Sequence, residues 1–100
     1  MTVGWFSAQL RFRSKICDAS CHDPLCEESI RLIEAETETV AWAKAAALGQ
    51  ASEHTYENDQ GELVQWVFVR VVEVQDLCED EIKDGVEVFS RLRWSSAEGD

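Results

Sequence analysis

The strongest constraint on the fold is a valine-rich run at residues 62–77, where Trp66 and Phe68 stand among six valines. Valine and aromatic residues favour β-strands. Sixteen residues exceed the usual strand length, so we expect a bend or a β-bulge near Glu73. Because a disordered acidic tail would lack such large apolar groups, the run also predicts a chain that folds.

Three further segments carry strand patterns. Residues 5–13 alternate between an apolar side and a more polar side, which is typical of a half-buried strand. We expect two more strands at 28–35 and 86–94, and a weak candidate at 53–57. The apolar side of residues 5–13 consists of Phe6, Ala8, Leu10 and Phe12.

A helix pattern follows Thr37, which we interpret as an N-cap. The helix is expected over 38–48, with Gly49 after its end in a left-handed conformation. The resulting order, β-β-α-β-β-β, predicts an α+β fold: one antiparallel-type sheet of four to five strands with a single helix packed on one face. We expect a single domain over residues 1–100, with its core at about 5–94 and a flexible tail at 95–100.

One helix can cover only one face of the sheet, so the other face is a candidate binding surface. We expect Phe6, Ala8, Leu10 and Phe12 to face the helix with Ile30, Leu32, Val67, Val69, Val88 and Leu92. The uncovered face would then carry aromatic residues and all six arginines: Trp5, Arg11, Arg13, Arg31, Trp66, Phe68, Arg70, Phe89, Arg91 and Arg93.

Arginine and tryptophan are enriched at interface hot spots, so this face could bind a second copy, an acidic peptide or single-stranded nucleic acid. The alternative is a solvated face on which arginine stems cover aromatic rings and pair with Glu across strands. A bulge in the long strand would move part of this set to the other face.

The net charge of -11 bears on the partner. The four main strand segments hold six acids and six arginines, so the whole excess lies in the helix, loops and tail. Strong negative charge disfavours nucleic-acid backbones and anionic membranes, and favours a basic protein partner. With neither a signal-peptide pattern nor an apolar stretch of membrane-spanning length, we expect a cytoplasmic protein and no membrane partner.

Cys17, Cys21, His22 and Cys26 offer four possible zinc donors within ten residues. Their spacing differs from that of zinc knuckles, and the adjacent Cys21 and His22 cannot both turn to one ion without strain. We therefore expect free thiols and no cofactor. A small metal-dependent or thiol enzyme built on these residues stays open as an alternative, which a zinc assay would decide.

Several short sequence motifs follow one another in a characteristic order over residues 5–92. They include Trp5-Phe6-Ser7-Ala8, Leu10-Arg11-Phe12-Arg13, Leu48-Gly49, His54-x-Tyr56-x-Asn58 and Trp66-x-Phe68-Val69. This order resembles a small bacterial family known as domain of unknown function 4288. The resemblance implies a stand-alone bacterial protein and supplies no activity, cofactor or catalytic residue. Two departures are the cysteines within residues 14–27 and Val40, where family members often carry a Glu that would complete a capping box.

These observations favour a non-enzymatic protein that works by binding other proteins. We expect a homodimer formed through the uncovered sheet face or an edge strand, or a complex with a basic protein partner. One variant is an inhibitor or immunity-type accessory protein whose acidic loops mask a basic target. The alternatives are the metal or thiol enzyme above and a single-stranded nucleic-acid binder that uses the arginine-rich face.

Overall fold

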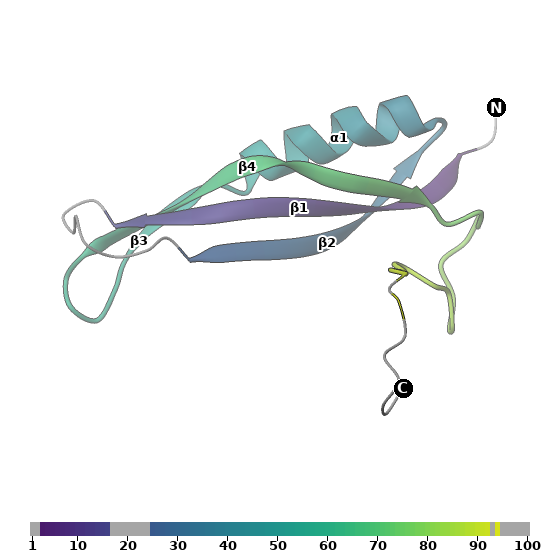
Figure 1. The fold of residues 1–100 in the computed structure, drawn as a ribbon. Helices are drawn as coiled ribbons and strands as arrows, with labels where there is room; N and C mark the ends of the chain where they lie inside the picture. Colours follow the sequence, from purple (N-terminus) through teal and green to yellow (C-terminus); the bar gives the residue numbers. More distant parts are fainter. Residues whose placement is uncertain (1–2, 17–24, 93, 95–100) are drawn as a thin grey trace.

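The computed structural model describes residues 3–16, 25–92 and 94, and it contains four strands and one helix (Figure 1). The order along the chain is β-β-α-β-β. The elements are β1 (Gly4–Ile16), β2 (Cys26–Ala35), α1 (Glu38–Ala51), β3 (His54–Glu57) and β4 (Leu63–Asp76).

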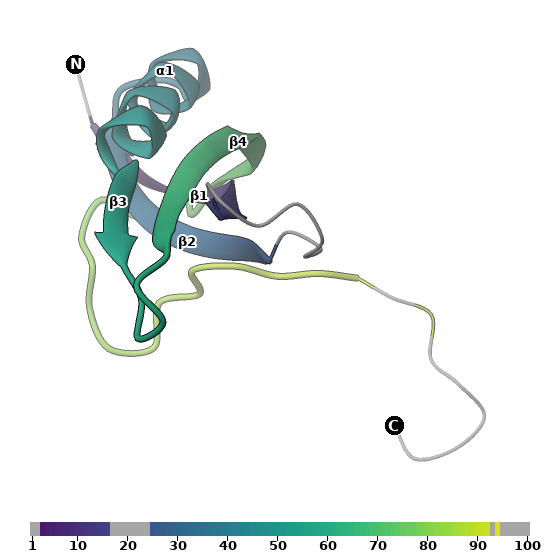
Figure 2. The same cartoon turned by 90° about the vertical axis from the view of Figure 1, so that its left-hand side faces the viewer.

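All four strands pair antiparallel in one curled sheet of order β2-β1-β4-β3 (Figure 2). Helix α1 links the two edge strands, β2 and β3, and therefore crosses one face of the sheet. The α+β class, the sheet and the single helix on one face are as the sequence predicts. The weak strand candidate at 53–57 is β3.

The core lies between α1 and β1. Phe6, Ala8, Leu10 and Phe12 are all buried on the helix side of β1, as the alternation predicts. The helix contributes Ala41 and Ala45, which are fully buried. Their small side chains allow the helix axis to approach the sheet closely.

Strand β2 turns the opposite way from the expectation. Ile33 and Ala35 belong to the core at 7% and 2% exposure, whereas Ile30 and Leu32 are 45% and 41% exposed. Apolar residues occupy both sides of this strand, so alternation alone cannot choose the buried side. The pairing chooses it, because Ile33 lies opposite the buried Phe6 and directly opposed residues share a face.

Strand β4 is bulged twice, and the bulges decide its faces. One register shift falls between Gln9 and Leu10 of β1 and leaves Val72 unpaired, next to Glu73, where a bulge is expected. A second falls between Arg11 and Phe12 and leaves Val69 unpaired. Each bulge inverts the alternation. The two inversions cancel beyond Val69, so only Arg70 and Val71 change sides. Arg70 lies opposite Arg11 on the face away from the helix, whereas Trp66 and Phe68 pack against the core, contrary to the expected placement.

Helix α1 begins as predicted at Thr37, whose Oγ1 accepts a hydrogen bond from the Val40 backbone N–H at 3.2 Å. It ends later than predicted, at Ala51, with Ser52 as the C-cap. Gly49 is a buried residue inside the helix and not the residue after its end. A Cβ at this position would overlap the ring of Phe68. Close helix–sheet approach, not a left-handed turn, therefore requires this glycine.

The expected last strand at 86–94 is wrong for the residues described. After β4, hydrogen bonds from Leu77 N to Trp5 O and from Trp5 N to Glu79 O extend the ladder briefly. A turn follows, with Val86 N bonded to Lys83 O and Gly85 at φ +87°. Residues 86–92 then run without strand pairing on the side of the sheet opposite α1 (Figures 1 and 2). Within the described ranges, no helix is both long and apolar enough to cross a bilayer.

Replacing Ile33 by alanine should lower the free energy of unfolding by about 2–5 kcal/mol, because the change leaves a cavity beside Phe6. The matched variant Ile30→Ala should cost less than about 1 kcal/mol, because Ile30 is already half exposed. Urea denaturation at low protein concentration measures both without a contribution from association. Equal losses would contradict the orientation of β2.

Gly49→Ala tests the contact between the helix and Phe68. Overpacking costs about 1–3 kcal/mol, which outweighs the gain of about 1 kcal/mol in helix propensity. We therefore expect a less stable protein by urea denaturation. The neighbouring exposed position gives the control, since Gln50→Ala should change stability by less than about 0.5 kcal/mol. A more stable Gly49→Ala protein would disprove the tight contact.

Candidate protein-binding surface

The sheet face opposite α1, called here the open face, receives only part of the predicted site. Its side chains alternate with the core residues of each strand. On β1 it carries Trp5, Ser7, Gln9, Arg11, Arg13 and Lys15; on β2, Glu28, Ile30, Leu32 and Glu34; on β4, Gln65, Val67, Arg70, Glu73 and Gln75.

Four of the ten predicted residues, Trp5, Arg11, Arg13 and Arg70, lie on the open face as expected. Arg31 does not, because it lies opposite the buried Ala8 on the helix side. Phe89 and Arg91 lie on the segment after β4, where the Arg91 guanidinium is 5.8 Å from the centre of the Phe89 ring. Trp66 and Phe68 belong to the core, as described above. Arg93 is outside the described residues.

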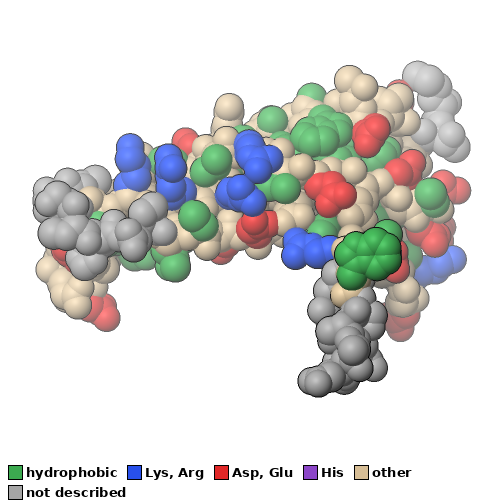
Figure 3. All heavy atoms as spheres, in the orientation of Figure 1, with side chains coloured by type: hydrophobic (Ala, Val, Ile, Leu, Met, Phe, Trp, Pro, Cys, Tyr) green, Lys and Arg blue, Asp and Glu red, His purple; other side chains and the backbone are tan. Residues whose placement is uncertain are grey.

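A basic row crosses the open face and consists of Arg11, Arg13, Lys15 and Arg70 (Figure 3). Arg11 and Arg70 are directly opposed across β1 and β4, an arrangement that is unfavourable without an anion nearby. Arg11 Nη2 contacts Glu28 Oε1 at 2.7 Å, but both side chains are more than a third exposed, so this pair contributes less than about 1 kcal/mol. The row can therefore accept further carboxylates.

Sequence reasoning missed Lys15. The expected strand ended at residue 13, whereas β1 continues to Ile16 and keeps its alternation to that point. A longer alternation count would have found it.

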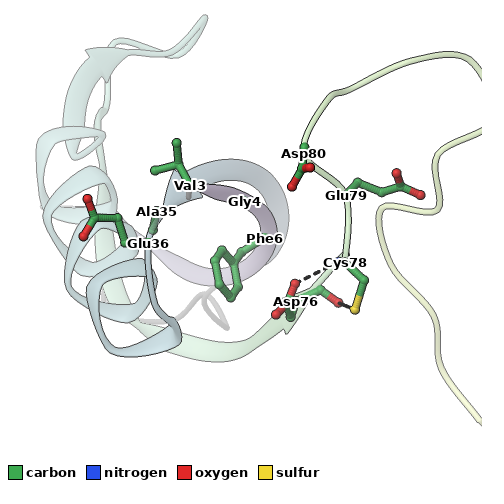
Figure 4. Close-up of a pocket in the computed structure, with 9 residues that line it drawn as sticks. All are labelled: Val3, Gly4, Phe6, Ala35, Glu36, Asp76, Cys78, Glu79 and Asp80. Atoms are coloured by element: carbon green, nitrogen blue, oxygen red, sulfur yellow. Dashed lines mark hydrogen bonds between the residues drawn. The ribbon is translucent and has the colours of Figure 1, made fainter. Parts of the chain in front are cut away.

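The opposite end of the sheet is acidic. A cavity of about 300 Å³ lies there, and the acidic residues Glu36, Asp76, Glu79 and Asp80 are among those that line it. The carboxylates of Glu36 and Glu79 point outward from it (Figure 4). Its remaining lining residues are Val3, Gly4, Phe6, Ala35 and Cys78. No Lys or Arg is among these lining residues, so the cavity offers negative charge beside an apolar wall.

The backbone keeps this acidic end in place. Asp76 Oδ1 accepts the Cys78 N–H at 2.8 Å, and Cys78 adopts φ 58°. A non-glycine residue in the left-handed region is uncommon, and the Asp76 contact stabilises the turn locally. Through the bond from Trp5 N to Glu79 O, the turn is also attached to β1.

The side chain of Gln75 attaches the segment after β4 to the open face. Gln75 Nε2 donates to Ser90 O at 3.0 Å, and Gln75 Oε1 accepts from Ser90 N at 3.4 Å. Beside Gln75, Ser7 is 1% exposed, and its Oγ has no hydrogen-bond partner among the described residues. Beyond Ser90, Leu92 and Trp94 are both 97% exposed. Sequence reasoning missed Gln75, for which no local pattern gives a signal.

The candidate metal and thiol residues are only partly described. Cys17, Cys21 and His22 lie outside the described residues. Cys26 is the exposed first residue of β2. Cys78, which is also exposed, follows β4 at the other end of β1, so these two cannot share an ion. Among the residues that the structure describes, no three His, Cys, Asp or Glu side chains are grouped to hold a metal.

Gln75→Ala should free the segment that contains Ser90. Losing about 1 kcal/mol of hydrogen bonding corresponds to about a five-fold increase in opening. Trypsin cleavage after Arg91 should accelerate by this factor at low protein concentration, where copies stay apart. Gln65→Ala, on the same face of the same strand, is the control and should leave the rate unchanged. Unchanged cleavage in Gln75→Ala would show that the contact does not hold the segment.

The comparisons with known proteins agree with the order of short stretches along the chain. Searches of the curated proteins and of the solved structures found no match to this chain. Residues 5–90 match the family model described as "Domain of unknown function (DUF4288)". The match covers every strand and the helix, and the chain belongs to this uncharacterised family.

Proposed function

We propose that this protein is a non-enzymatic binding module that associates with a second copy of itself through the open face. The observation that carries the proposal is the separation of charge along the sheet. The basic row lies toward the Ile16 end of β1, and the acidic cavity lies toward the Gly4 end. A protein of net charge -11 thus concentrates positive charge on one part of its surface.

This separation suits an isologous pair. In a two-fold dimer the same patch serves both copies, so residue i of one contacts residue j of the other, and the reverse. Two copies placed antiparallel over the open face would set each basic row against the Gly4 end of its partner, where Glu34 and Glu73 lie on the open face. The interaction occurs twice, and its electrostatic part is sensitive to salt.

Apolar groups between the two charged ends support the same arrangement. Ile30 and Leu32 are exposed on the open face near the outer edge of β2. Burying them against another copy would contribute hydrophobic stabilisation that the single chain does not obtain. Charged ends then set the orientation, and the apolar centre supplies affinity.

A basic protein partner is the second candidate, and the acidic cavity favours it. Its acidic lining residues and the apolar Val3 and Phe6 could receive the charge and the stem of a Lys or Arg side chain. This is the inhibitor or immunity-type variant. Binding of a basic partner depends on the acidic end and not on the basic row, whereas self-association depends on the basic row.

The proposal predicts that light scattering detects a dimer of twice the 11.3 kDa chain mass. The protein concentration at which half of the chains are dimeric should rise as salt is added. Arg70→Glu should weaken the dimer about ten-fold, since it reverses a charge in the basic row twice per dimer. Gln50→Glu, which adds a negative charge on the exposed side of α1, is the control and should have no effect.

A wild-type protein that remains monomeric at about 1 mM, where a Kd in the millimolar range becomes visible, would contradict self-association. A monomer that shifts single-stranded oligonucleotides at low salt would instead assign the basic row to nucleic acid. Binding of a basic protein that survives Arg70→Glu but is lost in Glu79→Lys would favour the second candidate.

A further inference from the structure

We propose that residues 86–92 of one copy add to the outer edge of β2 of the other copy as a fifth strand. This inference rests on the proposed function and specifies how the two copies hold each other. It would also explain why a segment with a strand pattern has no strand partner in the single chain.

The outer edge of β2 is the first part of the fit. Strand β2 is an edge of the sheet and is ten residues long. Ser14 N donates to Leu25 O at 2.9 Å, and backbone groups alternate between the two sides of a strand. The N–H and C=O groups of residues 26, 28, 30, 32 and 34 therefore point outward, away from β1. At Glu34 the C=O accepts a hydrogen bond from Lys44 Nζ, and within the described residues no strand pairs with this edge. An edge of this kind is a template for another strand.

The segment itself is the second part. Ser90 uses its backbone N–H and C=O together, and both bond to the amide of Gln75. A primary amide offers the same donor and acceptor as a neighbouring strand. Gln75 thus occupies one position of a backbone edge that is otherwise suited to a ladder. Val88 and Leu92, on the same alternation as Ser90, are exposed.

One antiparallel register pairs the two sequences well. Placing Val88 opposite Ile30 puts Val86 opposite Leu32, so two apolar pairs meet on the open face. On the other face, Glu87 lies opposite Arg31, and Arg91 lies opposite Glu27. In this register the backbone N–H and C=O of Glu28 would bond to the backbone of Ser90, in place of the side-chain amide of Gln75. Moving the segment by two residues in either direction removes both opposite-charge pairs, and opposite-charge cross-strand pairs are favourable.

The length of the connection restricts the pairing of residues 86–92 with β2 of the same chain. Glu79 is fixed beside Trp5, and the turn from Lys83 to Val86 is closed by a hydrogen bond. The four steps from residue 79 to 83 span at most about 14 Å, and the turn from 83 to 86 adds less than about 7 Å. Passing from the β4 position to the outside of β2 requires three strand spacings, about 14 Å, and Leu32 lies about 7 Å along the sheet from the partner of Trp5. The connecting residues would therefore have to be almost fully extended. A second copy has no such restriction, and Leu92 and Trp94, beyond Ser90, are both 97% exposed.

The test reverses the Arg91–Glu27 pair across two chains. Glu27→Arg and Arg91→Glu should each weaken the homodimer about ten-fold, because each creates two like-charge contacts. Mixing the two variants should yield a heterodimer of about wild-type affinity, since both contacts then join opposite charges. Native mass spectrometry measures all three species. Glu57→Arg, on the other edge strand, is the control and should dimerise like the wild type.

The outcomes separate this inference from the proposed function. Homodimers that persist unweakened in both single variants would overturn the strand exchange and leave self-association intact. Single variants that lose affinity without recovery on mixing would also overturn it. A wild-type protein that never dimerises would overturn both, including the case in which residues 86–92 pair with their own β2. Circular dichroism of each variant shows whether the fold is retained.

Discussion

The ladder between β1 and β4 is the interaction on which the rest of the structure depends. Strand β1 is central and buries Phe6, Ala8, Leu10 and Phe12 on one side. Two bulges in β4 keep Phe68, Val71 and Val74 on that same side despite their irregular spacing. Without the bulges, the alternation of β4 would turn Val71 toward solvent. The ring of Phe68 then sets how closely α1 can approach, which is why position 49 must be glycine.

Charge is distributed unevenly on this framework. The strand segments defined from sequence are electrically balanced, and the acidic excess lies outside them. In three dimensions the positive and negative charges of the sheet are separated. Arg11, Arg13, Lys15 and Arg70 gather at one end, and acidic residues line a cavity at the other. Net charge therefore says little about which partner a given face accepts. Charge position along the sheet is the more informative quantity.

Among the described residues, some backbone hydrogen-bonding groups have no strand partner. Strand β2 presents an open edge, and residues 86–92 carry a strand pattern without strand pairing. Gln75 satisfies the backbone of Ser90 alone. Edges of this kind are commonly covered in natural proteins. Self-association offers one way to cover the edge and the exposed Ile30 and Leu32 together.

The sequence alone determined the family resemblance, the α+β class, β1 and its buried side, the Thr37 cap and the bulge beside Glu73. These depend on local alternation and capping, which act within a few residues. Tertiary structure decided the faces of β2 and β4, the position of Gly49 inside α1 and the unpaired state of residues 86–92. Ile30, Leu32 and Ile33 are all apolar, so only pairing with Phe6 could choose among them. The members of the open face also followed from pairing, because the two bulges of β4 turn Arg70 to the open face and Val71 to the core while the residues on either side keep their alternation.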